Sequence, residues 1–75
     1  MGKNILYPNI MAELARNGLS VAMLAEYMGR TTQNIYYKLN GRTEMTHKDM
    51  IKIQQFIHEY GGGVLTLDYL FQAKP

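Results

Sequence analysis

Residues 28–43, MGRTTQNIYYKLNGRT, hold a cluster of side chains suited to hydrogen bonding with another molecule. Gln33 and Asn34 each offer an amide that both donates and accepts, and Tyr36 and Tyr37 add two phenols. An amide can bond bidentately to adenine, and a tyrosine can bond to a phosphate or a base edge and contact a thymine methyl. This chemistry is typical of a surface that lies in a groove of duplex DNA.

The charge of the chain is concentrated around the same segment. The formal net charge is only +2, which by itself does not indicate a polyanionic partner. Residues 30–52 nevertheless hold five cationic side chains against two carboxylates, whereas the rest of the chain, including Lys3 and Lys74, holds three against four. The five are Arg30, Lys38, Arg42, Lys48 and Lys52. Such a bias suits contact with phosphates, although an ordinary solvated surface would explain it equally well.

A helical period divides this segment into a buried and an exposed side. At about 100° per residue, Ile35 and Leu39 share one side of a helix over about 32–39 and would anchor it to a core. Gln33 and Tyr37 then fall on the opposite side. Their i, i+4 spacing would let the two side chains reach neighbouring base edges together.

The other polar residues of this helix fall between the two sides. Thr32 lies at the first turn, and Asn34 and Tyr36 lie beside the exposed side. Tyrosines on short helices are often half buried with the hydroxyl in water, and this alternative applies more to Tyr36 than to Tyr37. Tyr37 is therefore the better candidate for base reading, and Tyr36 for packing and phosphate contact.

The elements that must position these residues form an all-α chain. Seventy-five residues, 47% of them hydrophobic and none of them cysteine, predict one small domain over residues 1–75 that is stabilised by its core and not by disulfides. No apolar run approaches the roughly 20 residues of a membrane span. We therefore expect a soluble intracellular protein without a membrane partner.

Capping and stop signals predict about five helices. Pro8 suits a first helical turn, Gly29 a left-handed C-terminal cap, and Thr46 with Asp49 a capping box. The predicted N-caps are Ser20, Thr31, Thr46 and Thr66. The glycine run at 61–63 is expected to connect two helices, because no strand precedes it and its spacing fits no phosphate-binding loop.

Residues 19–43, LSVAMLAEYMGRTTQNIYYKLNGRT, resemble the helix-turn-helix of the Cro and repressor family of phage and bacterial transcription regulators, also called XRE-like or lambda-repressor-like. The resemblance is carried by an LA pair, a turn glycine, a Ser or Thr cap, a buried aliphatic and a closing NG pair. Here these are Leu24, Ala25, Gly29, Thr31, Ile35, Asn40 and Gly41.

The resemblance implies a compact bundle of about five helices, with a helix-turn-helix at about 20–40 and a recognition helix at about 32–39 in the major groove. The family's base-reading positions fall on Thr32, Gln33 and Tyr37, with Asn34 and Tyr36 beside them. Its phosphate-contacting loop falls on Asn40, Gly41, Arg42 and Thr43. It also implies a bacterial cytoplasmic or nucleoid location, a phage or prophage-type regulator, and no cofactor.

The sequence departs from the family pattern at three positions. Val21 stands where many members have a phosphate-contacting Gln, and Thr32 where the recognition helix usually begins with Gln. Lys38 stands where an apolar residue is usual, with Leu39 one place later. Because Lys38 flanks the predicted recognition helix, we expect it to contact a phosphate together with Arg42.

Catalysis is not expected from this sequence. His47 and His58 are eleven residues apart, no cysteine is present, and no carboxylate pair has a recognisable spacing, so neither a metal site nor a nucleophile pair is indicated. The alternative to DNA binding is a helix-turn-helix fold used as a protein-interaction module, of an antitoxin-like or adaptor kind.

A homodimer is expected, at least on DNA, because one recognition helix reads only a few base pairs. The apolar residues near the C-terminus exceed what a short helix can bury, so they form a candidate dimer surface, unless all of them cover the core. They are Val64, Leu65, Tyr69, Leu70 and Phe71.

Overall fold

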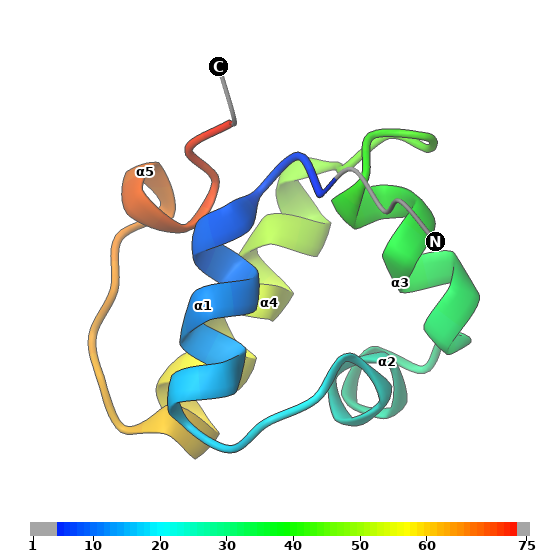
Figure 1. Ribbon diagram of the computed structural model, residues 1–75. Helices are drawn as coiled ribbons and strands as arrows, with labels where there is room; N and C mark the ends of the chain where they lie inside the picture. The colour runs from blue at the N-terminus through cyan, green and yellow to red at the C-terminus, as the bar shows by residue number, and fades with distance from the viewer. Residues whose placement is uncertain (1–4, 74–75) are drawn as a thin grey trace.

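The computed structural model describes residues 5–73 and is drawn in Figure 1. The two ends of the predicted domain, residues 1–4 and 74–75 with Lys3 and Lys74, lie outside the described residues. Residues 5–73 contain five α-helices and no strand, so the predicted all-α class is confirmed. The helices are α1 (Pro8–Arg16), α2 (Val21–Met28), α3 (Thr32–Leu39), α4 (His47–Gly61) and α5 (Leu67–Leu70).

The longest helix, α4, is the one on which most of the others pack. It contacts α1, α2 and α5, while α3 packs chiefly against α2 and α5 also touches α1 (Figure 1). The Cα atoms of the described residues have a radius of gyration of 11.2 Å, and these residues enclose one apolar core. Its members are Ile10, Leu14, Val21, Leu24, Ala25, Ile35, Leu39, Met45, Ile53, Phe56, Ile57 and Leu70.

Each predicted cap forms as expected. The hydroxyls of Ser20, Thr31, Thr46 and Thr66 accept hydrogen bonds from the backbone N–H three residues later. The capping box is complete, because the Asp49 carboxylate also accepts from the Thr46 N–H. Gly29 ends α2 in the left-handed region at φ +71°, where a residue with a Cβ would be strained. These local bonds define where α3 begins.

The C-terminal segment lies against the core, which removes most of the apolar excess predicted there. Leu70 is fully buried, and Leu65, Tyr69 and Phe71 are partly buried against the core, while Val64 remains 82% exposed. The centroid of the Phe71 ring lies 5.4 Å from that of the Tyr7 ring. The Asn9 side chain donates a hydrogen bond to the Tyr69 carbonyl, and the Gln54 side chain donates one to the Leu65 carbonyl. The candidate dimer surface at this end is therefore reduced to Val64.

Candidate nucleic-acid interface

The helix α3 presents one side to the core and the opposite side to solvent. Ile35 and Leu39 are completely buried, as the helical period predicts. Thr32 and Gln33 are exposed, and Tyr37, one turn after Gln33, is partly exposed. No carboxylate lies within α3 itself. The exposed side of α3 therefore consists of a hydroxyl, an amide and a phenol.

Gln33 and Tyr37 are joined by a hydrogen bond. The Gln33 Nε2–H donates to the Tyr37 hydroxyl at 2.6 Å. The guanidinium of Arg42 lies over the other part of the same side chain, with its Cζ 5.0 Å from the centroid of the Tyr37 ring. The Gln33 Oε1 and the Tyr37 O–H remain able to bond to another molecule. We refer to Gln33, Tyr37 and Arg42 as the Gln33–Tyr37–Arg42 array.

The loop after α3 uses its backbone donors internally. The N–H groups of Arg42 and Thr43 both donate to the Tyr37 carbonyl, at 2.8 and 3.2 Å, and that of Gly41 donates to the Lys38 carbonyl. Arg42 N–H also donates to the Asn40 Oδ1 at 3.0 Å. Gly41 makes the reversal at φ +82°. A phosphate at this loop would therefore be contacted by the exposed side chains of Arg42 and Thr43, and not by a cradle of backbone N–H groups.

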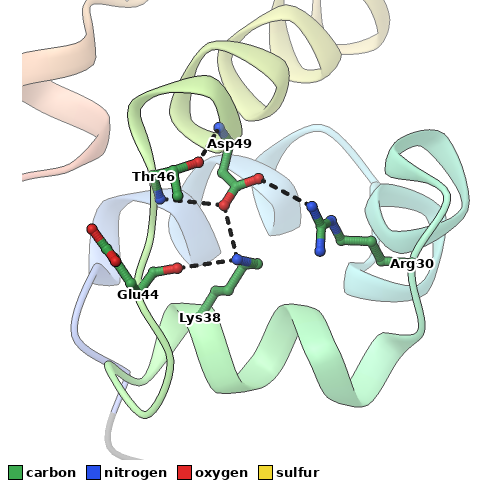
Figure 2. A network of polar contacts seen from close by, with 5 residues as sticks. All are labelled: Arg30, Lys38, Glu44, Thr46 and Asp49. Atoms are coloured by element: carbon green, nitrogen blue, oxygen red, sulfur yellow. Dashed lines mark hydrogen bonds and ion pairs between the residues drawn. The ribbon is translucent and has the colours of Figure 1, made fainter.

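Lys38 does not lie where a phosphate contact was expected. It is only 8% exposed, and its Nζ donates to the Asp49 Oδ2 at 2.8 Å and to the Glu44 carbonyl at 3.0 Å (Figure 2). The reason is its position three residues after Ile35, which turns it toward the N-terminus of α4. Its ammonium is already bound within the protein, so Lys38 is a structural residue of the α3–α4 contact.

Asp49 is the centre of this polar network. Burial by itself would raise the pKa of its carboxyl, but hydrogen bonds from Lys38 and Thr46, together with the charge of Lys38, hold the pKa below its ordinary value of 3.8. The remaining oxygen, Oδ1, lies 3.7 Å from the Arg30 Nη2 (Figure 2). One carboxylate thus links the connection before α3, the last turn of α3 and the first turn of α4.

Asn34 and Tyr36 are less available than the residues of the array. The Asn34 Oδ1 is enclosed by protein and has no hydrogen-bond partner within the described residues. Tyr36 is partly buried and packs against the core. Of the five predicted base-reading residues, Thr32, Gln33 and Tyr37 therefore face outward together, while Asn34 and Tyr36 are turned partly inward.

A second surface feature, which was not predicted from the sequence, lies on α2 and α4. The rings of Tyr27, Phe56 and Tyr60 form a cluster with centroids 5.2 to 6.1 Å apart. Tyr60 is 59% exposed, and Met23 beside it is 43% exposed. With Glu26 they line a shallow hollow of about 260 Å³. The i, i+4 pairs Met23–Tyr27 and Phe56–Tyr60 were the available sequence signal.

Residues 5–73 contain no group of three or more His, Asp or Glu side chains arranged to hold a metal ion. In the same part of the chain, no helix has the length and apolar character needed to cross a bilayer.

The chain matches no protein-family model, no curated protein and no solved structure.

Proposed function

We propose that this protein is a sequence-specific duplex-DNA-binding regulator of transcription, of the phage or prophage type. In this proposal α2 and α3 form a helix-turn-helix over residues 20–40, and α3 enters the major groove. The observation that carries the proposal is the Gln33–Tyr37–Arg42 array, because it combines an amide, a phenol and a cation on the exposed side of a helix that has no carboxylate.

Each member of the array has a distinct task. The Gln33 amide reads a base edge, with adenine the best match for its paired donor and acceptor. The Tyr37 ring and hydroxyl contact the neighbouring base pair, and their bond to Gln33 fixes both side chains before DNA arrives. Arg42 and Thr43 contact the phosphate backbone. Thr32 is placed at the first turn to contact a base or sugar.

Two copies bind one site in this proposal. The described Cα atoms span 29 × 27 × 24 Å, so two domains side by side on one face of DNA would bring their α3 helices to a spacing near one helical turn, about 34 Å. A pair of half-sites would supply the specificity that one short helix lacks. The protein would act in the bacterial cytoplasm, on the nucleoid.

The aromatic cluster on α2 and α4 favours a second candidate function, that of a protein-interaction module. Tyr27, Tyr60 and Met23 are large, partly exposed and grouped around a hollow, a composition common at protein interfaces. No residue of α3 belongs to this cluster. The two functions therefore use different surfaces and can be separated by substitution.

Binding-site selection from random duplexes tests the main proposal. The parent protein should enrich a defined sequence, and Gln33→Ala should relax the preference at one or two of its base positions while Tyr60→Ala leaves it unchanged. The log of the affinity should fall steeply with the log of the salt concentration. Failure to enrich any sequence, with a partner interaction that Tyr60→Ala abolishes, would favour the interaction module.

A further inference from the structure

The Asp49 network contains one carboxylate and two cations. Asp49 and Lys38 have side chains that are 5% and 10% exposed, and their 2.8 Å separation is that of a charge-assisted hydrogen bond. Lys38 is additionally bound by the Glu44 carbonyl. Lys38 alone therefore balances the charge of Asp49, without Arg30.

Arg30 is only loosely attached to this pair. Its Nη2 lies 3.7 Å from the Asp49 Oδ1, which is longer than the roughly 2.7–2.9 Å of a charge-assisted hydrogen bond. Its side chain is 43% exposed. A guanidinium in this position stays fully charged, and its remaining donors are available to solvent or to an anion.

Arg30 lies at the N-terminal end of α3. Arg30 immediately precedes Thr31, the N-cap of α3, while Arg42 follows the other end of the helix (Figure 2 shows Arg30). Eight helical residues span about 12 Å, close to the roughly 12 Å width of the major groove. Two arginines at the two ends of α3 would both be near phosphates if the helix lay in that groove.

We infer that Arg30 is a second phosphate-binding residue, at the N-terminal end of α3, and that Asp49 positions it there. This inference rests on the proposed DNA binding. Asp49 limits the motion of the guanidinium without neutralising it, because Lys38 occupies the better-placed oxygen. On DNA, Arg30 exchanges the distant carboxylate for a phosphate. Lys38 acts through Asp49 and touches no phosphate.

The salt dependence of binding to the selected duplex tests the contact. Arg30→Gln should make the log–log slope shallower by about 0.9, which is the loss of one phosphate. Across a fourfold change in salt, this alters the affinity ratio of variant to parent by about 3.5-fold. Arg42→Gln should give the same change, and Arg16→Gln, an equal loss of charge on α1, should give none.

The outcomes separate the two proposals. Suppose that the parent protein binds DNA, that Arg42→Gln has a shallower log–log slope, and that Arg30→Gln has the same slope as Arg16→Gln. This result would overturn the Arg30 contact and leave the proposed function standing. A parent protein without salt-dependent binding to any selected duplex would overturn both. Far-UV circular dichroism of every variant establishes that it is folded.

The positioning role of Asp49 has its own test. Lys38→Met leaves Arg30 as the only cation beside Asp49 within residues 5–73, so the guanidinium should move toward the carboxylate and the log–log slope should become shallower by about 0.9. The same substitution in an Arg30→Gln background should change nothing further. The role of Asp49 would be overturned if Lys38→Met alone left the slope unchanged. It would also be overturned if Lys38→Met made the slope of Arg30→Gln shallower by about a further 0.9. Lys38→Gln replaces Lys38→Met if the latter does not fold.

Discussion

Replacing Asp49 by Asn should destabilise the fold strongly at neutral pH. Asn keeps the shape of the side chain and an oxygen that can accept from the Thr46 N–H, so the capping box persists. What is lost is the negative charge beside Lys38, whose side chain is only 10% exposed. Removing one partner of a buried ion pair costs about 3–5 kcal/mol, since the other charge is left uncompensated.

The lower end of this range applies here. The Glu44 carbonyl still accepts from Lys38, so the ammonium retains one hydrogen bond. We expect a loss of about 3 kcal/mol in the free energy of unfolding, which for a chain of this size lowers the Tm by about 12–24 °C. Urea unfolding followed by circular dichroism measures it. The double variant Lys38→Met, Asp49→Asn should recover most of the loss, since it removes both buried charges of the pair and leaves only the exposed Arg30 without its carboxylate.

The pH dependence gives the same prediction a second check. The pKa of Asp49 is lower in the folded state than its ordinary 3.8, so the unfolded chain binds more protons and acidification favours unfolding. The stabilisation by the Asp49 carboxylate is complete above pH 3.8 and is lost as the pH falls through the lower pKa of the folded state. The difference between parent and Asp49→Asn should therefore shrink as the pH is lowered below 3.8. Equal stability at pH 7, or a difference that persists at the acid limit, would refute the reasoning.

Further substitutions test separate parts of the structure. Gln33→Ala should lower the binding free energy by about 1–3 kcal/mol on a selected duplex and by little on random duplex, which a competition titration measures. Tyr37→Phe keeps the ring but removes the oxygen bonded to Gln33, and it should lower the binding free energy by less. Tyr36→Ala should lower the Tm more than Tyr37→Ala, because the Tyr36 ring packs against the core; equal effects in thermal melts would contradict this. Thr46→Ala removes the N-cap of α4 and should cost about 1 kcal/mol in urea unfolding, with no change in the affinity for DNA.

The helices could be predicted because their boundaries depend on local chemistry. A Ser or Thr N-cap bonds to an N–H three residues later, and a glycine relieves strain at its own φ angle. Such signals act within one turn of chain and are visible in the sequence. The buried side of α3 was predictable for the same reason, since Ile35 and Leu39 are separated by one turn.

The environment of Lys38 could not be predicted in this way. Its partner Asp49 lies eleven residues later on another helix, and only the packing of α4 brings the two together. The same limitation applies to the C-terminal end, where contacts with Tyr7 and Asn9 at the other end of the chain decide which apolar residues are covered. Long-range contacts of this kind leave no periodic signal.

The polar side chains of α3 form two separate sets of contacts, one on the exposed side of the helix and one on the side toward α4. On the exposed side, Gln33 donates a hydrogen bond to Tyr37, and the Arg42 guanidinium lies over the Tyr37 ring. On the side toward α4, the Lys38–Asp49 pair joins the last turn of α3 to the first turn of α4. A small domain has few apolar residues to spare for fixing a helix of only eight residues. We expect the directional bonds of the buried ion pair to restrict the orientation of such a helix more than a methionine in the same place would.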